Sequence, residues 1–596
     1  MILQALCKYY DILEREDTSD LPRDGFSLGK ADFALILSKD GELTGIMDLR
    51  EKDGKRIISK QMLVPEQSGR SGKNAPSYFL CDNAKYVLGI GDDEKLSAFS
   101  RFKELHKSVL EPKHPVIKFL DNWKPKEEIS TIKVEKYNEK SGKKTEENQY
   151  AFKNINIDKY KEEFANNPNI IFKIEGVKGY VHEDEEIFNA WHKNSSNNKD
   201  DIKMQCLVTG NFDTISRLHT PIKGVKNAQA AGASIVSFNN ESFCSYGKEA
   251  SFNAPISRNA MFKYTTVLKY LLNNPKYRLF IGDSTVVFWA EKTGIYEDLL
   301  AELFNPSNEE IDEGISEKNV KTRDLARDIL QRYSVGLNLR KEAYDLDPNT
   351  NVHILGISPN NARLSIAFYE VNTFEYFVKR LADHYSNMNI AGNIRPIPIW
   401  VILNETLPKV SKDKKVSPVL SKSLMNSILT GNQYPASLYN AMISRIRADR
   451  DINYKRVAII KACLTRKYKL YKNKEEITVS LNESNSSVPY HLGRLFAVLE
   501  KAQKEALGIT TIKDRYFTSA SATPASVFPV MMKLSLHHTA KAEWGRSIEK
   551  QKGEILKKVD QFPKHLSLDE QGEFILGYYH QSQAFYTKNE KKGEVK

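Results

Sequence analysis

The chain has 596 residues, of which 40% are hydrophobic and 28% charged, and its 88 Lys or Arg against 76 Asp or Glu give a net charge of +12. This composition predicts a large ordered protein of two to four domains with substantial cores and excludes a chain that is disordered overall. The start of the chain has no basic segment followed by a long apolar run, and no later run approaches a membrane span, so we expect neither secretion nor membrane insertion.

The cysteines indicate a reducing compartment. They are five scattered residues without a C-x-x-C pair, so neither a disulfide framework nor a thiolate zinc site is predicted. They are Cys7, Cys81, Cys206, Cys244 and Cys463. We therefore expect a cytoplasmic protein.

Residues 1–120 predict a mixed α/β region. A helical stretch precedes two apolar runs, Phe33 to Leu37 and Leu43 to Leu49, joined across Asp40-Gly41, and this pattern is a hairpin signal. Further strand signals occur at Gln61 to Val64 and at Tyr86 to Ile90.

A long loop of small and basic residues, Gln67 to Ser77, lies between the last two runs. Its glycines allow close backbone approach, its cations can neutralise phosphates, and its amides and hydroxyls can hydrogen-bond base edges. We predict that it probes duplex DNA, whereas a mobile exposed loop is the alternative. The candidate contacts are Gln67, Arg70, Ser71, Lys73, Asn74 and Ser77.

Residues 121–410 predict a second α/β portion with polar insertions at 124–150 and 194–201. Buried strands are expected over 278–290, and Val352 to Ile357 pairs naturally with Ala362 to Tyr369. The run Ile397 to Leu403 gives the last strand signal before a domain boundary near residue 410.

The segment from Leu218 to Ser234 combines small residues, amides and lysines. It is too poor in glycine for a nucleotide-binding loop. Contact with nucleic acid or with a partner's backbone is one interpretation, and a tightly packed structural loop is the other. The candidate contacts are Lys223, Lys226, Asn227 and Gln229.

Positive charge is concentrated in the predicted basic helical segment, residues 411–480. Between Lys412 and Lys474 there are 15 Lys or Arg against three aspartates, with tyrosines interleaved. This excess equals that of the whole chain, so the remainder is close to neutral. Many cations beside flat rings predict a nucleic-acid partner, whereas a solvated basic helix surface is the alternative. The candidate contacts, called here the basic track, are Arg445, Arg447, Lys455, Arg456, Lys461, Arg466, Lys467 and Lys469.

Residues 481–596 predict four helices, at Pro489 to Leu507, Pro524 to Lys541, Ser547 to Asp560, and Leu568 to about Thr587. Thr523 and Pro524 suit cap and first-turn positions, and Ser567 with Glu570 has capping-box spacing. The predicted fold class is an α+β N-terminal region followed by an all-α C-terminal four-helix bundle. We interpret the stripe Phe574, Ile575, Tyr578 and Tyr579 as its core rather than as a base-stacking platform.

The sequence contains no recognisable catalytic motif. The sequence has no G-x-x-x-x-G-K-[ST], no G-x-S-x-G and no H-E-x-x-H. Asp283 is one carboxylate where a two-metal nuclease needs several, so a structural role is favoured for it. The adjacent His537 and His538 point in different directions on a helix and lack a third ligand. We predict a protein without catalysis, bound metal or cofactor.

Several blocks together resemble the large subunit of the type I-C CRISPR effector complex, Cascade, of the Csd family. The resemblance runs over the full length and is specific because the blocks occur in the family's order. They are Arg70-Ser71-Gly72 through Phe79-Leu80-Cys81-Asp82, Tyr86-Val87-Leu88-Gly89, Ile235-Val236-Ser237-Phe238-Asn239, Ser245-Tyr246-Gly247-Lys248, Asn253-Ala254-Pro255, GDSTVVFWA, ILGISPNNARLSIAFY, LGRLFAVLEKAQ and QGEFILGYYHQ.

The resemblance implies a non-enzymatic subunit of a guide-RNA (crRNA) complex in antiviral defence, beside the subunit that binds the RNA's 5′ handle and the backbone subunits. It would read the protospacer-adjacent motif on target double-stranded DNA, support R-loop formation and present a surface to the recruited helicase-nuclease. The loop Gln67 to Ser77 would then be the motif reader, the basic track would follow DNA, and Lys248 joins the candidate contacts.

The resemblance also implies that the helical end corresponds to the complex's small subunit, which in this family can be made separately by internal translation. This sequence has no methionine between Met442 and Met531, so such a product would start at a non-methionine codon near Val479 or Leu481, or at Met442. Cys244 and Ala250 also depart from the polar residues that the family pattern has at these positions.

Two other functions remain as alternatives. One is a metal-dependent nuclease that uses Asp283, for which Mg²⁺-dependent cleavage is expected. The other is a nucleic-acid-binding factor that acts alone, for which high affinity of the lone chain is expected.

Overall fold

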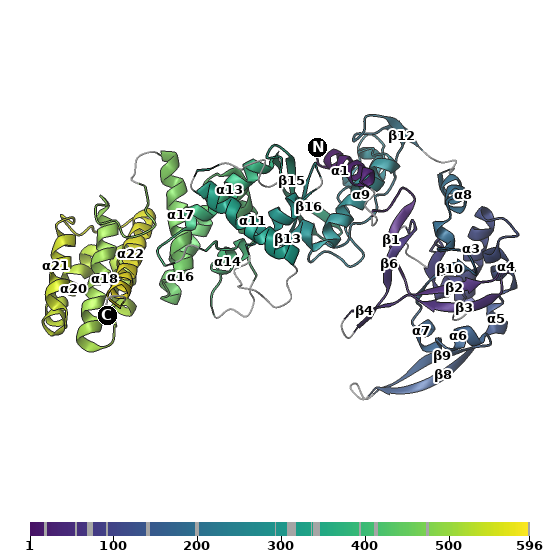
Figure 1. The fold of residues 1–596 in the computed structure, drawn as a ribbon, viewed down its shortest axis with the longest axis horizontal. Coiled ribbons are helices and arrows are strands. Elements are labelled where there is room, and N and C mark those ends of the chain that lie inside the picture. Colours follow the sequence, from purple (N-terminus) through teal and green to yellow (C-terminus); the bar gives the residue numbers. More distant parts are fainter. Residues whose placement is uncertain are drawn as a thin grey trace. The chain divides into compact units, whose positions relative to one another are not determined.

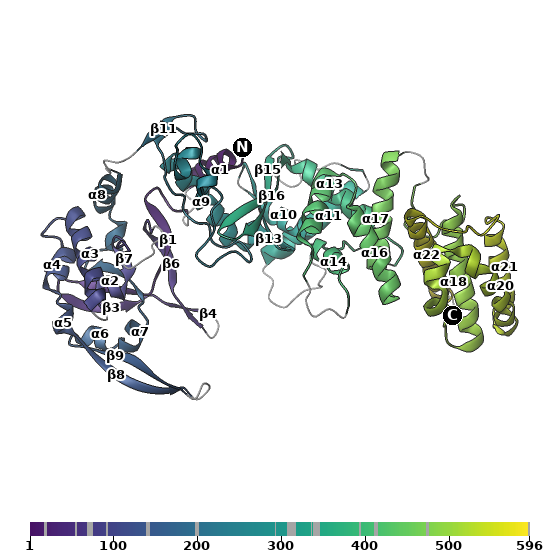
Figure 2. The same cartoon turned by 180° about the vertical axis from the view of Figure 1, so that it is seen from behind.

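The structure is a computed structural model, and it describes residues 1–16, 21–53, 56–67, 75–90, 93–138, 143–196, 202–292, 294–306, 317–334, 336–337, 346–392, 395–409, 415–471 and 476–593. The chain divides into two compact units: Met1–Ile222 with Ser234–Tyr270, and Lys223–Ala233 with Leu271–Lys596. Figures 1 and 2 show the chain from two opposite sides. The predicted boundaries near residues 120, 410 and 480 do not coincide with this division.

The first unit mixes short strands with helices, as predicted for an α/β region. Its strands are β1 (Phe26–Ala31), β2 (Phe33–Leu37), β3 (Leu43–Asp48), β4 (Glu51–Asp53), β5 (Arg56–Ile58), β6 (Lys60–Pro65), β7 (Cys81–Asn83), β8 (Ile129–Asn138), β9 (Lys143–Phe152), β10 (Asn169–Ile174), β11 (Lys203–Gln205) and β12 (Phe212–Thr214). Its helices are α1 (Ile2–Arg15), α2 (Ala84–Val87), α3 (Asp93–Val109), α4 (Pro115–Asn122), α5 (Pro125–Glu128), α6 (Ile155–Asp158), α7 (Lys161–Ala165), α8 (Glu185–Ser196) and α9 (Arg258–Asn273), whose last turn enters the second unit.

A four-stranded sheet of order β3-β2-β10-β7 organises the core of this unit. The predicted hairpin is confirmed, because β2 pairs antiparallel with β3, while β10 adds to β2 in parallel. Phe172 of β10 contacts Phe102 of α3 and Phe119 of α4, with ring centroids 6.3 Å apart in both pairs. These two helices therefore cover one face of the sheet with aromatic side chains.

Of the two other strand predictions, one is confirmed and one is wrong. The run Gln61 to Val64 forms strand β6, which pairs with β1. The expected strand Tyr86 to Ile90 is wrong: the chain is extended only over β7 and continues into α2. The ladder to β10 ends at Asn83 opposite Asn169, and Asn167 Oδ1 accepts from Lys85 N at 2.8 Å. Without a longer partner strand, the next residues satisfy their backbone groups as a helix.

The second unit combines one sheet with many helices. Its strands are β13 (Arg278–Ile281), β14 (Ser284–Ala290), β15 (Asn351–Asn360) and β16 (Arg363–Thr373), in antiparallel order β13-β14-β15-β16. Its helices are α10 (Tyr296–Phe304), α11 (Glu317–Ser334), α13 (Phe374–Met388), α14 (Ile399–Asn404), α15 (Pro418–Thr430), α16 (Ala436–Asp449), α17 (Tyr454–Tyr471), α18 (Val488–Leu507), α19 (Ile512–Ala522), α20 (Pro524–Lys541), α21 (Gly545–Leu556) and α22 (Leu568–Gly593). The predicted pairing over 352–369 is confirmed, and the strands expected over 278–290 form an antiparallel hairpin, β13 with β14.

The apolar run Ile397 to Leu403 is not a strand. Residues from Ile399 form helix α14, in which Ile399, Ile402 and Leu403 are buried. Their spacing of three and four residues places them on one helix face. Trp400, which is 55% exposed, falls on another face and remains at the surface.

The C-terminal region is helical as predicted, but residues 476–593, all of which are described, contain five helices rather than four. The additional helix, α19, follows Thr511 and lies between the first two predicted helices. The capping box is confirmed, since Glu570 Oε2 accepts from Ser567 N at 2.7 Å and Ser567 Oγ accepts from Glu570 N at 3.4 Å. The stripe from Phe574 to Tyr579 is buried core, also as predicted.

Helices α18 and α22 cross at two glycines. A Cβ at Gly493 would collide with the backbone of Phe574, and one at Gly577 would collide with the backbone of Tyr490. The neighbours are main-chain atoms, which cannot rotate away. Both positions therefore require glycine, because any side chain there would prevent the close approach of α18 and α22.

Among the residues that the structure describes, no helix has the length and apolarity needed to traverse a bilayer.

Candidate nucleic-acid interface

The stem of the predicted motif loop is held firmly. Gln67 Nε2 donates to the carbonyl oxygen of Cys81 at 2.9 Å, and Gln67 N donates to Ser27 Oγ at 3.2 Å. On the returning side, Tyr86 Oη donates to the carbonyl oxygen of Ala75 at 3.4 Å. These bonds fix where the loop leaves and re-enters the fold.

This arrangement corrects two predicted DNA contacts. The amide nitrogen of Gln67 is already engaged by Cys81, and the hydroxyl oxygen of Ser77 is buried within the fold. Both side chains therefore belong to the stem and are not available to base edges. The four other candidates, Arg70, Ser71, Lys73 and Asn74, lie outside the described residues.

His106 also stabilises this stem. His106 Nε2 accepts from Leu80 N at 2.9 Å, and Leu80 has the left-handed φ of +53°. His106 Nδ1 lies 2.7 Å from the carbonyl oxygen of Phe102, and burial lowers the pKa of the ring to about 4. The imidazole is thus neutral and holds a strained backbone turn next to the loop.

The predicted contact segment around Lys226 packs at its base and is exposed at its tips. Val225 is buried, and Lys226 N donates to Thr285 Oγ1 at 3.0 Å. Lys223, Lys226, Asn227 and Gln229 have exposed side chains. Both interpretations of this segment therefore apply to different parts of it: a packed base carries polar side chains at the surface.

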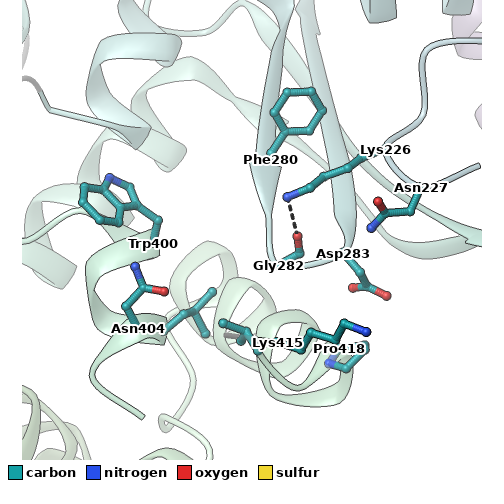
Figure 3. A pocket seen from close by; sticks show the side chains of 11 residues that line it. Lys226, Asn227, Phe280, Gly282, Asp283, Trp400, Asn404, Lys415 and Pro418 are labelled. Atoms are coloured by element: carbon teal, nitrogen blue, oxygen red, sulfur yellow. Dashed lines mark hydrogen bonds between the residues drawn. The ribbon is translucent and has the colours of Figure 1, made fainter. Parts of the chain in front are cut away.

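Lys226 and Asn227 line a hollow of about 440 Å³ in the second unit (Figure 3). The β13–β14 turn, helix α14 and the start of α15 supply the other walls. The lining residues are Lys226, Asn227, Phe280, Gly282, Asp283, Trp400, Leu403, Asn404, Lys415, Val416 and Pro418. The hollow joins cations, amides and aromatic rings, which is the chemistry that binds nucleic acids.

Phe280 and Trp400 are functional candidates that the sequence does not mark as surface residues. Phe280 is 45% exposed, and its ring lies 5.6 Å from Lys226 Nζ and 5.2 Å from Arg278 Cζ. The alternation of a hairpin strand could have placed Phe280 opposite the buried Ile281, but Trp400 sits in an apolar run with no outward sign.

Asp283 occupies the turn of the β13–β14 hairpin. The preceding Gly282 has a φ of +63°, and a Cβ there would collide with Ser421 Oγ, so this turn requires glycine. Ser284 Oγ donates to Asp283 Oδ1 at 3.4 Å, and the Gly282 carbonyl accepts from Lys226 Nζ at 3.1 Å. Asp283 is the one carboxylate in the lining, and no metal-binding group of three His, Cys, Asp or Glu is found among the described residues.

Lys248 lies in the first unit on a loop that a single side chain secures. Asn253 Oδ1 accepts from Ser245 N at 2.8 Å, and Asn253 Nδ2 donates to the carbonyl oxygens of Lys248 and Ala250, both at 3.0 Å. The exposed Lys248 is therefore presented from a fixed backbone, next to Tyr246, which is 99% exposed.

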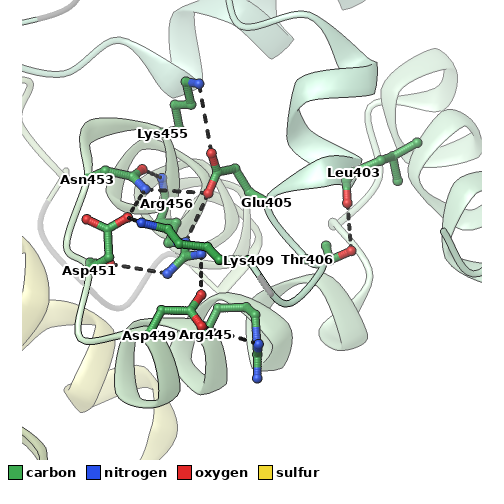
Figure 4. A network of polar contacts seen from close by, with 10 residues as sticks. All are labelled: Leu403, Glu405, Thr406, Lys409, Arg445, Asp449, Asp451, Asn453, Lys455 and Arg456. Atoms are coloured by element: carbon green, nitrogen blue, oxygen red, sulfur yellow. Dashed lines mark hydrogen bonds and ion pairs between the residues drawn. The ribbon is translucent and has the colours of Figure 1, made fainter. Parts of the chain in front are cut away.

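The basic track is corrected at Arg456, whose side chain is only 1% exposed (Figure 4). Its Nη2 pairs with Asp449 Oδ2 at 2.6 Å and its Nε with Glu405 Oε2 at 3.0 Å. The same carboxylates pair with Arg445 at 3.4 Å and with Lys455 at 3.9 Å. A buried cation held by two carboxylates is a structural element and cannot reach a phosphate.

Two more cations of the track are buried. Lys461 Nζ donates to the carbonyl oxygen of Asn387 at 3.0 Å, and burial lowers its pKa to about 8. Arg466 Nη1 donates to the carbonyl oxygens of Ser427 and Asn432 at 2.5 and 2.7 Å. Both side chains therefore tie α17 to neighbouring helices, and the prediction that they follow DNA is wrong.

The remaining track residues divide into partnered and exposed ones. Lys467 pairs with Asp569 at 2.6 Å, and Arg447 Nη2 donates to Gln571 Oε1. Lys469 is exposed on α17. The other seven residues of the basic track thus bond to carboxylates, to an amide or to carbonyl oxygens of the fold.

A family model described as CRISPR-associated protein (Cas_Csd1) matches residues 6–586, which is nearly the whole chain. No curated protein matches the chain.

Proposed function

The chain belongs to the CRISPR-associated Csd1 family, and from this premise we propose that it is the non-catalytic large subunit of a type I-C guide-RNA surveillance complex. In that complex it recognises the protospacer-adjacent motif on double-stranded DNA, supports R-loop formation and offers a surface to the helicase-nuclease. The match over residues 6–586 carries this proposal. Base pairing with the guide then supplies most of the sequence information, so few base contacts are needed from the protein.

Two surfaces support the proposal. The residues on either side of the predicted motif loop are held by hydrogen bonds, Gln67 to Cys81 and Tyr86 to Ala75, which anchor the two ends of the loop in the fold. The hollow beside Lys226 offers cations and aromatic rings to an unpaired strand. The cations of α16 and α17 are mostly committed to the fold and are not part of this proposal.

Changes at the tip of the motif loop should alter the preference for the motif. We expect Lys73→Ala or Asn74→Ala to reduce discrimination between motif variants by roughly 5- to 150-fold, because a lost base-edge contact costs about 1–3 kcal/mol. The measurement is binding of the assembled complex to duplexes with each flanking motif.

The control for this experiment is Lys469→Ala, which removes an exposed cation of α17. It should leave the motif preference unchanged and at most weaken binding to all duplexes alike. A uniform loss in the loop variants as well would make the loop a phosphate clamp and place the motif reader elsewhere.

The proposed role is non-catalytic, so incubation of the full chain with Mg²⁺ and duplex or single-stranded DNA should yield no cleavage. A nuclease that uses Asp283 predicts the opposite, with activity that disappears in Asp283→Ala. Denaturing gels of end-labelled DNA distinguish the two. Cleavage by the wild type that Asp283→Ala abolishes would replace the proposal with the nuclease.

We further propose that the helical end is also made separately as the small subunit. Tyr439 Oη donates to the carbonyl oxygen of Leu568 at 2.8 Å, and Gly572 packs directly under Tyr439. A start near Leu481 or at Met442 would remove Tyr439 from this face of α22, whereas only a product that starts at Met442 would keep α17, whose Lys467 pairs with Asp569. Mass spectrometry of the cytoplasmic complex should find a fragment whose N-terminus lies between residues 442 and 490, and a search that finds none would refute separate synthesis.

A further inference from the structure

We propose that the hollow between the β13–β14 turn and α14 binds one unpaired nucleotide of the displaced DNA strand, with its base stacked on Trp400 or Phe280. This inference rests on the proposed function, because R-loop formation supplies the displaced strand. The relevant residues are Phe280, Trp400, Lys226, Lys415, Asp283 and Asn227.

Stacking surface is the first requirement, and two rings meet it. Trp400 and Phe280 are 55% and 45% exposed, although each could have been buried in the large apolar core beside it. Both rings line this hollow and also a second one of about 270 Å³ on the side of Arg278. Adjacent hollows that share two exposed rings form a ridge on which successive bases can stack.

Charge is the second requirement. Arg278 and Lys226 lie over the Phe280 ring at 5.2 and 5.6 Å, and Lys415 lies on the opposite wall. Lys226 is oriented by its bond to the Gly282 carbonyl at 3.1 Å, so its position does not depend on a ligand. Cations on both sides of an aromatic ridge suit a phosphate backbone that passes over a stacked base.

A polar edge completes the hollow. Figure 3 shows the two rings toward one side, with Asp283 and Lys415 toward the other. The Asp283 carboxylate can accept a hydrogen bond from the amino group of cytosine, adenine or guanine, and Asn227 can donate to or accept from a base edge. Thymine has no amino group, so it should bind least well. A paired base presents this edge to its partner strand, so the site favours unpaired nucleotides.

The first test uses the isolated full chain and single-stranded DNA of 15 nucleotides. Trp400→Ala and Phe280→Ala should each weaken binding roughly 5- to 150-fold, the range expected for one stacked base. Trp544→Ala is the matched control, since Trp544 is also 55% exposed and lies directly before helix α21, and it should change affinity less than twofold. Asp283→Asn should reduce the preference for dC over dT. Equal affinity in Trp400→Ala, Phe280→Ala and Trp544→Ala would overturn the inference.

The second test places 2-aminopurine at single positions of the displaced strand, or of the guide RNA, in the complete complex. The expected result is quenching at one or two displaced-strand positions that Trp400→Ala removes and Trp544→Ala retains. Quenching confined to the guide RNA would overturn the displaced-strand assignment. Motif-dependent R-loop formation is measured in parallel. If R-loops form but Trp400→Ala has no effect on quenching, the nucleotide site is refuted and the proposed function stands. If no R-loops form although the chain binds single-stranded DNA through Trp400, the proposed function is refuted and the nucleotide site stands.

Discussion

Replacing Arg456 with glutamate is expected to lower the free energy of unfolding of the second unit by at least about 3–5 kcal/mol, the cost of breaking a buried ion pair from one side. The substitution removes the partner of Asp449 and Glu405 and adds a third carboxylate beside them. Because folded domains are stable by only about 5–15 kcal/mol, much of the chain should unfold. Urea unfolding followed by circular dichroism measures the loss.

Lys469→Glu is the matched control for Arg456→Glu. It makes the same charge reversal on the same helix at an exposed position, and a change within about 0.5 kcal/mol is expected. Similar small effects from both substitutions would contradict the structural role of Arg456. A consequence for binding studies follows: lost DNA binding after charge reversal at Arg456, Lys461 or Arg466 would report damage to the fold, and only exposed cations can report contact.

Acidification is expected to destabilise the protein steeply between about pH 6.5 and pH 4. In five of the buried histidines the pKa of the ring is lowered, and burial is the main cause in each. The pKa falls to about 4 for His106, His182, His219 and His580, and well below its usual value for His384. These rings stay neutral in the folded protein at pH values where an unfolded chain protonates them.

The sign follows from proton uptake. Between about pH 6.5 and pH 4 the unfolded state binds more protons at these histidines than the folded state, so the free energy of unfolding falls as the pH is lowered through this window. Each histidine can contribute up to about 3 kcal/mol. Thermal unfolding at pH 7.5, 6 and 5 should show a falling Tm with decreasing pH.

Two variants test the attribution to buried rings. His106→Gln should lower the Tm at pH 7.5, because Leu80 N loses its acceptor, and should make the dependence on pH shallower. His565→Gln changes an exposed histidine and should leave the pH dependence as it is. A Tm that stays constant between pH 6.5 and pH 5 in the wild type would contradict this prediction.

Local signals explain the parts of the fold that the sequence predicts correctly. The hairpin across Asp40-Gly41 follows from a turn glycine that tolerates a positive φ, and the start of α22 follows from the capping pair Ser567 and Glu570. The wrong predictions concern segments whose conformation depends on contacts with residues far away in the sequence. Tyr86 lacks a strand to pair with, and the short apolar run around Trp400 fits a helix or a strand equally well until its burial is known.

The candidate site shows the same division. The charge excess of the window 412–474 is real in the sequence, but some of the carboxylates that pair with its cations lie outside the window. Glu405 precedes Arg456 by 51 residues, and Asp569 follows Lys467 by 102. A local count cannot include such partners. The segment at Lys226 was found because its lysines and amides are contiguous, whereas the rings opposite it come from β13 and α14 and meet it only in the fold.

The central claim is that this chain reads the protospacer-adjacent motif, and the most direct measurement compares the guide-RNA backbone complex with and without it. Binding is measured to matched duplexes whose three flanking positions are randomised, followed by sequencing of the bound fraction. We predict enrichment of one motif only when the chain is present. Equal binding and equal motif preference without the chain would contradict the claim and assign motif recognition to another subunit.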